Sequence, residues 1–203
     1  MRIPSPAAAP GLRIGLLGGS FDPPHGGHVH ITRWALRALA LDRIWWLVSP
    51  GNPLKQNDPV GIERRMRACR DLVQGMPVAV TDLERYLGSP YTADTLRWLA
   101  GRYPGVRFVW LMGADNLAVF HRWERWRWIM EHTDIAVFAR PGQQVRAGLS
   151  PAARLYARQR LEPEAARLLG RGPRAGRWAL LTGPMSDQSS TRLRAQGAWG
   201  PGI

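Results

Sequence analysis

The sequence predicts an α/β domain in which a parallel sheet is covered by helices on both faces. Two observations support this fold class. Short apolar segments alternate with amphipathic helical segments along nearly the whole chain, and this alternation is typical of parallel strands joined by crossover helices. Polar, glycine-rich segments follow four of the predicted strands, so they would gather at the carboxyl edge of the sheet, where open sheets bind ligands. The expected architecture is therefore doubly wound and Rossmann-like.

Six segments have the short apolar character of buried strands and end at a glycine or a polar turn. They are 12–17 (LRIGLL), 43–49 (RIWWLVS), 77–81 (PVAVT), 106–113 (VRFVWLMG), 134–140 (DIAVFAR) and 177–183 (RWALLTG). Five segments between or after them have apolar residues at helical spacing. They are 28–40, 61–75, 91–103, 123–132 and 189–197. Thr92 is the expected N-terminal cap of the third of these helices.

The composition fits one domain over residues 11–203, preceded by a flexible tail at 1–10. Residues 141–176 are rich in Arg, Ala, Gly and Pro, and we expect a variable helical insertion there. No apolar run reaches the roughly 18 residues of a membrane span. Cys69 is the only cysteine, which excludes a disulfide framework and favours a cytoplasmic protein. A homo-oligomer is left open.

The formal net charge is +13, which is compatible with an anionic partner. Because the arginines are spread along the whole chain, they also fit a solvated surface without a specific partner. One basic residue differs from the rest, because Lys55 is the only lysine among 28 basic residues. A compact ammonium can approach a phosphate where the planar guanidinium group does not fit. A single lysine retained by chance is the alternative.

The first polar segment, GGSFDPPHGGH, spans residues 18–28. It matches neither the Walker A pattern nor G-x-G-x-x-G. Its glycines would still let backbone N–H groups approach phosphate oxygens at the start of a helix. His25 and His28 would project from one side of the first helical turn. They could be a zinc pair, which would need further ligands, or a structural pair satisfied by backbone carbonyls; we favour donors to a bound phosphate.

Several segments occur together in an order that is specific. They are GGSFDPPHGGH, SPGNPLK (49–55), YTADTL (91–96), GADNL (113–117) with Phe120 and Trp123, RPG (140–142) and SSTRLR (189–194). This series resembles bacterial nicotinate-nucleotide adenylyltransferases of the nucleotidylyltransferase superfamily, over roughly residues 12–197. The resemblance implies transfer of the adenylyl group from ATP to nicotinate mononucleotide, with Mg²⁺ held mainly by the ATP phosphates and no dedicated protein metal site.

The resemblance also implies the roles of individual residues. The catalytic residues would be His25, His28, Lys55 and Arg194. The ATP site would comprise Gly18, Gly19, Ser20, Phe21, His25, His28, Lys55, Gly113, Asp115, Ser190, Thr191 and Arg194. The mononucleotide site would comprise Asn52, Thr92 and Trp123. Trp123 is expected at the start of a helix, where free N–H groups could receive the nicotinate carboxylate.

Two departures from the family pattern concern the substrate side. Gln188 replaces the usual branched aliphatic residue before the last motif, and Pro90 interrupts the usual S-Y-T. The alternatives to nicotinate mononucleotide as acceptor are nicotinamide mononucleotide and phosphopantetheine. An RNA- or membrane-binding module using HRWERWRW (121–128) is an alternative of another class, but it does not explain the polar segments at the strand ends. We therefore expect small-molecule substrates, and neither nucleic acid nor a membrane as partner.

Overall fold

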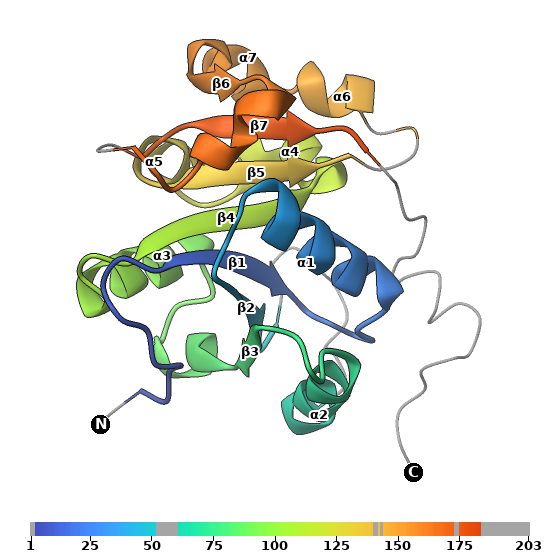
Figure 1. The fold of residues 1–203 in the computed structure, drawn as a ribbon, viewed down its shortest axis with the longest axis vertical. Helices are drawn as coiled ribbons and strands as arrows, with labels where there is room; N and C mark the ends of the chain where they lie inside the picture. Colours follow the sequence, from blue (N-terminus) through green and yellow to red (C-terminus); the bar gives the residue numbers. More distant parts are fainter. Residues whose placement is uncertain (1–2, 52–60, 140–141, 143, 173–174, 184–203) are drawn as a thin grey trace.

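The computed structural model describes residues 3–51, 61–139, 142, 144–172 and 175–183. In these residues one all-parallel sheet has the strand order β3-β2-β1-β4-β5-β7-β6 (Figure 1). The strands are β1 (Arg13–Gly19), β2 (Arg43–Val48), β3 (Val78–Thr81), β4 (Arg107–Gly113), β5 (Asp134–Phe138), β6 (Arg160–Leu161) and β7 (Trp178–Leu181). The predicted fold class and all six predicted strands are confirmed, with ends shifted by up to two residues.

The α-helices are α1 (Gly26–Ala38), α2 (Ile62–Leu72), α3 (Thr92–Arg102), α4 (Ala114–Val119), α5 (Trp126–His132), α6 (Gln144–Gly148) and α7 (Pro151–Leu155). Four 3-10 helices join them: η1 (Leu83–Tyr86), η2 (Phe120–Arg122), η3 (Ala157–Gln159) and η4 (Pro163–Leu168). The last predicted helix, 189–197, lies outside the described residues.

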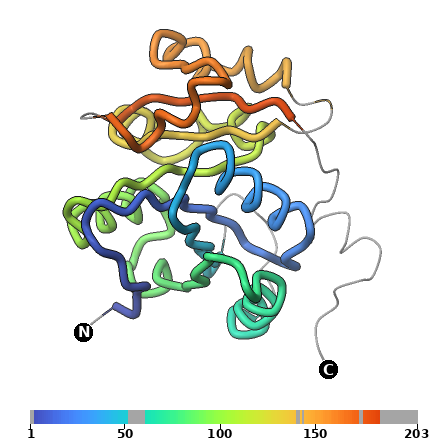
Figure 2. Tube along the Cα trace, viewed as in Figure 1, coloured from blue at the N-terminus to red at the C-terminus, as the bar shows by residue number. Residues whose placement is uncertain are grey.

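The strand order reverses between β1 and β4, the two central strands. From β1 the chain builds outward through β2 to β3, and it then returns to the centre and builds the other half from β4. Figure 2 shows this division, with the strands of the first half of the chain on one side and those of the second half on the other. In open parallel sheets, ligands bind outside the carboxyl ends of the strands at such a reversal, here the ends of β1 and β4.

Each face of the sheet carries its own hydrophobic core, as a doubly wound sheet requires. The adjacent residues Trp45 and Trp46 on β2 illustrate this, since successive strand side chains point to opposite faces. Trp45 belongs to the core beneath α3, α4 and α5. Trp46 belongs to the core beneath α1 and α2, where its Nε1 donates to Thr32 Oγ1 at 2.9 Å.

The region 141–176 contains the short helices α6 and α7, which lie against α4. That this region is a variable insertion stays a prediction. The short edge strand β6 was not predicted; it pairs in parallel with β7 through Arg160 and Leu161. Two residues are too short a pattern to reveal a strand by alternation, and only the pairing partner defines it.

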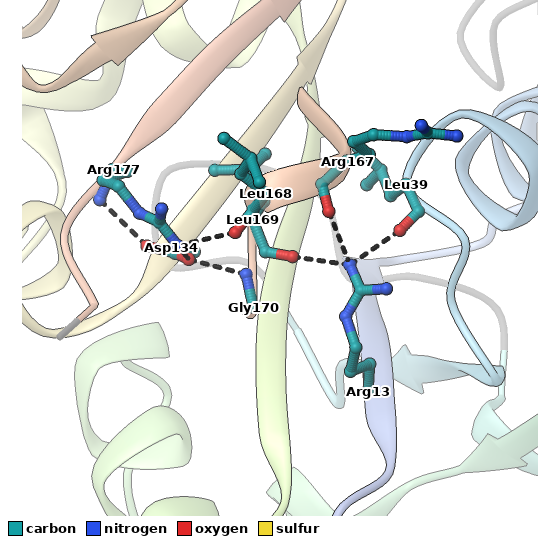
Figure 3. Close-up of polar contacts among 8 residues, drawn as sticks. All are labelled: Arg13, Leu39, Asp134, Arg167, Leu168, Leu169, Gly170 and Arg177. Carbon is teal, nitrogen blue, oxygen red and sulfur yellow. Dashed lines mark hydrogen bonds and ion pairs between the residues drawn. The ribbon is translucent and has the colours of Figure 1, made fainter. Parts of the chain in front are cut away.

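Arg13 ties the amino end of β1 to two distant segments (Figure 3). Its guanidinium donates to the carbonyls of Leu39, Ala40 and Leu169, each at 2.7 Å, and to that of Arg167 at 3.2 Å. Burial lowers the pKa of Arg13. The carbonyl dipoles replace the lost hydration of the cation.

Asp134, at the start of β5, acts similarly at the same edge of the sheet (Figure 3). It accepts hydrogen bonds from the backbone N–H groups of Gly170 at 2.6 Å and Arg177 at 2.9 Å, and from the Arg177 guanidinium at 3.1 Å. These contacts fasten the segment after η4 to the amino end of the sheet, the edge opposite the predicted site.

Residues 3–10 differ from the loose tail that the sequence predicts. They form no helix or strand, but Ile3 and Ala8 pack against the core and Tyr103 Oη donates to Pro6 O at 2.7 Å. Proline and alanine lose little side-chain entropy on ordering, which helps to explain why this segment can lie against the domain. None of the helices in the described ranges is long and apolar enough to cross a membrane.

Candidate functional site

The first loop begins directly at the carboxyl end of β1. The sequence suggested that Gly18 and Gly19 belong to the loop, but the structure shows that they are the last two residues of the strand. A Cβ on Gly18 would lie 2.5 Å from the Trp110 ring on β4. Gly18 is therefore required by packing between the central strands. The register pairs Leu17 with Leu111, which brings Gly19 and Gly113 to the same edge of the sheet.

His25 and His28 form a reciprocal cap at the start of α1. The Nδ1 atom of His25 accepts the N–H of Gly27 at 3.1 Å, and the Nδ1 atom of His28 accepts the N–H of His25 at 3.1 Å. The rings lie 3.9 Å apart between centroids. This arrangement is a capping box built from two imidazoles in place of the usual hydroxyl and carboxylate.

The cap determines which ring nitrogen carries the proton in both histidines. An Nδ1 atom that accepts a backbone N–H carries no proton, so a neutral ring must carry its proton on Nε2. Each histidine therefore presents an Nε2–H donor at the N-terminus of a 13-residue helix, whose dipole favours an anion. The helix predicted at 28–40 lies at Gly26–Ala38, so it begins directly after His25, and the histidines are suited to donate to a phosphate oxygen.

Phe21 packs against the ring of His28. Its ring is 1% exposed, lies 4.6 Å from the ring of His28 and stacks on Trp46 at 4.9 Å. Its φ of 47° is a left-handed conformation that costs a bulky residue energy and persists only where packing enforces it. The backbone role expected for Phe21 and Ser20 in the ATP site remains a prediction.

The loop after β4 lies at the carboxyl end of the strand next to β1. Gly113 is buried and caps α4, while Asp115 is exposed in the first turn of that helix. Both residues thus lie at the carboxyl edge next to the first loop, where the sequence placed them.

The expected mononucleotide residues Thr92 and Trp123 require corrections of their local structure. Thr92 is the first residue of α3 and not its cap; Tyr91 is in the cap position. Trp123 follows η2, and α5 begins only at Trp126. Because Trp123 is not at a helix start, the expected reception of a carboxylate by N–H groups beside it loses its basis. The Trp123 ring is partly buried, 5.0 Å from Phe120.

A network of polar side chains joins the segments that carry Thr92 and Trp123. Arg125 donates through Nη1 to Asp94 Oδ1 at 2.7 Å and through Nη2 to Oδ2 at 3.2 Å. Ser89 Oγ donates to Asp94 Oδ2 at 2.6 Å and accepts the Tyr91 N–H at 3.3 Å. We call the bidentate pair the Asp94–Arg125 clamp. It holds the turn before α5 against the first turn of α3.

Glu84 is the one described acid at this edge of the sheet with a strongly displaced pKa. It lies in η1, directly after β3, and its Oε1 accepts the Thr95 hydroxyl at 3.1 Å. Burial raises the pKa of Glu84 to about 7, and the hydrogen bond from Thr95 opposes the shift. The carboxyl group therefore changes its charge near neutral pH.

Tryptophans and arginines of the segment 121–128 are used within the domain. Trp126 lies edge-on to Tyr156 at 6.0 Å, with the Arg127 guanidinium 4.7 Å over its ring. Trp128 stacks on His132 at 4.6 Å between ring centroids. These rings thus pack against side chains of the same domain.

Five of the predicted site residues cannot be placed. Asn52, Lys55, Ser190, Thr191 and Arg194 lie outside the described residues. Within the described part of the chain, no group of three or more His, Cys, Asp or Glu side chains is arranged to hold a metal ion.

Comparison with known proteins agrees with this geometry. The family model described as cytidylyltransferase-like matches residues 16–196, from within β1 to beyond the last motif at 189–194, which lies outside the described residues. The chain belongs to the cytidylyltransferase-like family. The match covers the first loop, the carboxyl ends of β1 and β4 and the clamp, so the family assignment applies to the whole candidate site.

Curated relatives of this cytidylyltransferase-like chain carry a more specific name. A protein from Ruegeria pomeroyi named "Probable nicotinate-nucleotide adenylyltransferase" is 55% identical over 98% of this chain and 93% of its own length. A protein of the same name from Cereibacter sphaeroides is 61% identical over 92% of this chain and 98% of its own length. The resemblance drawn from the motifs is confirmed.

A solved structure confirms the fold. The Plasmodium falciparum nicotinic acid mononucleotide adenylyltransferase complexed with NaAD superimposes with a TM-score of 0.70 at 14% identity, covering 91% of this chain and 83% of that one. At this identity the likeness supports the sheet and its helices, and the details of the site come from the chain itself.

Two features of this cytidylyltransferase-like site were missed from the sequence. The imidazole capping box was hidden because histidine is not a usual cap residue. The buried Arg65 on α2 interrupts the apolar stripe of Ile62, Met66, Cys69 and Val73. A charged residue inside an apolar stripe is a signal that could have identified it.

Proposed function

We propose that the chain transfers the adenylyl group of ATP to nicotinate mononucleotide, forming nicotinate adenine dinucleotide and pyrophosphate. The observation that carries this function is the capping of α1 by the Nδ1 atoms of His25 and His28, which leaves Nε2–H as the donor of each neutral ring, after β1 at the point where the strand order reverses. The relatives that match nearly the whole chain are named for this acceptor. The cytoplasmic location expected from the single cysteine is part of the same proposal.

The reaction needs no general base on the protein. A phosphate oxygen of the mononucleotide, already ionised at neutral pH, attacks the α-phosphorus of ATP. A new P–O bond forms, the bond to the bridging oxygen of the β-phosphate breaks, and pyrophosphate leaves with the electron pair. Catalysis then consists of positioning the two anions and stabilising the charge that develops on the leaving group.

His25 and His28 are the proposed donors to the ATP phosphates. Because the backbone N–H groups hold their Nδ1 atoms, the Nε2–H groups are oriented before the substrate binds, which saves reorganisation in the transition state. Lys55 would bridge phosphates, and Ser190, Thr191 and Arg194 would hold the β- and γ-phosphates, as the family motifs imply.

Mg²⁺ would accompany ATP in this proposal. Mg²⁺ commonly needs few protein ligands because substrate phosphates and water complete its coordination shell. When bound, the ion would neutralise charge on the phosphates. We assign no protein side chain to it.

The mononucleotide would lie between Thr92 and Trp123, with the pyridine ring against the indole. The Asp94–Arg125 clamp joins the two segments that carry these residues, which supports a pocket with fixed walls. The correction at the start of α5 removes one argument for a nicotinate carboxylate, so the preference over nicotinamide mononucleotide rests on the relatives and needs a direct test.

The test is pyrophosphate release from ATP and Mg²⁺ with three acceptors offered separately. We expect turnover with nicotinate mononucleotide at least about tenfold above that with nicotinamide mononucleotide or phosphopantetheine. Equal rates with the two pyridine nucleotides would remove the carboxylate from recognition. Turnover with phosphopantetheine alone would replace the proposed acceptor.

A further inference from the structure

Arg65 connects two loops at the carboxyl edge of the sheet. It lies on α2, its side chain is 1% exposed, and its Nη1 donates to Ser20 O at 2.6 Å and to Ser49 O at 2.8 Å. Its Nη2 donates to Pro50 O at a longer 3.5 Å. Ser20 belongs to the loop after β1, and Ser49 and Pro50 begin the segment after β2.

These two loops have separate tasks in the proposed reaction. The first leads to His25 and His28, and the second leads along the sequence toward Lys55. One backbone hydrogen bond, from Ser49 N to Gly19 O at 3.0 Å, also joins them. The guanidinium group adds a second, side-chain link, and its planar fork fixes the spacing between carbonyls that approach from both loops.

The buried charge also has an electrostatic consequence. Burial lowers the pKa of Arg65, and the negative charge of Asp22 acts in the opposite direction. A guanidinium remains protonated even under strong burial. A permanent positive charge is thus held behind the first loop, with its hydration replaced by carbonyl oxygens that belong to the loops themselves.

We propose that Arg65 is a positioning residue for ATP, which sets the distance between the histidine loop and the loop that leads to Lys55. This inference rests on the proposed function for the identity of the nucleotide. Arg65 acts through the loop carbonyls and does not itself touch the substrate. Removing it would leave the donors chemically intact but would let the two loops separate.

The chain contains a matched control. Arg13 is also a buried arginine whose guanidinium donates to main-chain carbonyls, those of Leu39, Ala40, Arg167 and Leu169. It lies at the amino end of β1 (Figure 3), the edge away from the site. A substitution of Arg13 removes the same kind of contact far from the site. It therefore measures how much the loss of such a contact lowers the stability of the fold, without an effect on the ATP site.

The experiment compares R65K, R65M and R13K with the wild-type protein. The dissociation constant for ATP with Mg²⁺ is measured by calorimetry without any acceptor, and Tm is measured for each variant. We expect all three variants to lower Tm. We expect R65K to weaken ATP binding about tenfold and R65M to weaken it more, because loops held even 1 Å out of place lose much of their contact energy; a lysine retains one donor group for the carbonyls.

The dissociation constant of R13K for ATP should lie within twofold of the wild-type value. If R65K binds ATP as tightly as the wild type, or if R13K weakens binding equally, the positioning role is refuted; R65K decides the question even if R65M does not fold. The binding measurement contains no acceptor, so its result does not depend on whether nicotinate mononucleotide is the correct acceptor. A wild-type protein that binds ATP but releases no pyrophosphate would refute the proposed reaction and leave the inference about Arg65 standing.

Discussion

The Asp94–Arg125 clamp allows a quantitative prediction about the mononucleotide pocket. Replacing Arg125 with alanine removes two parallel hydrogen bonds, of 2.7 and 3.2 Å, between the turn that carries Trp123 and the helix that carries Thr92. The Arg125 and Asp94 side chains are 40% and 25% exposed, so solvent screens the pair. Exposed pairs contribute about 0.2–1 kcal/mol, and the bidentate geometry places this one toward the upper end.

An interaction of about 1 kcal/mol corresponds to roughly a fivefold change in an equilibrium constant. If all of it serves to hold the pocket walls together, R125A should raise KM for the mononucleotide by up to about fivefold, while KM for ATP changes less than twofold. D94N should have a similar effect, and the double variant should be no worse than the stronger single variant, because both remove one interaction.

Arg97 provides the control for this experiment. It also pairs with Asp94, at 3.5 Å within α3, and its guanidinium lies 4.8 Å over the ring of Trp128 on α5, so neither contact involves the turn that carries Trp123. We expect R97A to leave both KM values within twofold of the wild type. Initial-rate kinetics of pyrophosphate release measure all of these values. An unchanged mononucleotide KM in R125A, or an equal rise in R97A, would refute the role of the clamp.

Three further predictions concern other residues. H28A should lower kcat by about 10²-fold with little change in KM for the mononucleotide, since it removes a preorganised donor; an unchanged kcat in steady-state assays would exclude His28 from the mechanism. Because the pKa of Glu84 is raised from 4.5 to about 7, the folded protein binds more protons there than the unfolded chain does, and this part of the stability falls as pH rises between those values. E84Q should therefore flatten the decrease in urea-unfolding free energy over this range, and an unaltered pH profile would contradict the assignment. K55R should lower kcat if the single lysine serves a phosphate, whereas full activity would show that an arginine suffices there.

The sheet and the location of the site could be predicted from the sequence because they depend on local patterns. Apolar runs such as 43–49 identify buried strands, and glycine-rich turns after them identify the carboxyl edge. The strand order that makes β1 and β4 neighbours is a long-range property. It was not predicted, and only the structure shows it.

The details that could not be predicted depend on contacts between distant segments. Arg65 is one of many arginines in the sequence, and only the fold shows that its guanidinium reaches Ser20 and Ser49. The strand β6 is defined by its pairing with β7 alone. The start of α5 was predicted at residue 123, three residues too early, because WERWRW has helical spacing. In the structure Arg125 has a left-handed φ of 52° and is the N-cap, so the helix begins at Trp126.

The central claim is that ATP is cleaved between its α- and β-phosphates and that the adenylyl group moves to the mononucleotide. The most direct measurement follows the label after incubation of the protein with nicotinate mononucleotide and ATP labelled at either the α- or the γ-phosphate. We predict that the α-label appears in the dinucleotide and the γ-label in pyrophosphate. Transfer of the γ-label to the mononucleotide, or release of the γ-label as inorganic phosphate alone, would contradict the proposed reaction.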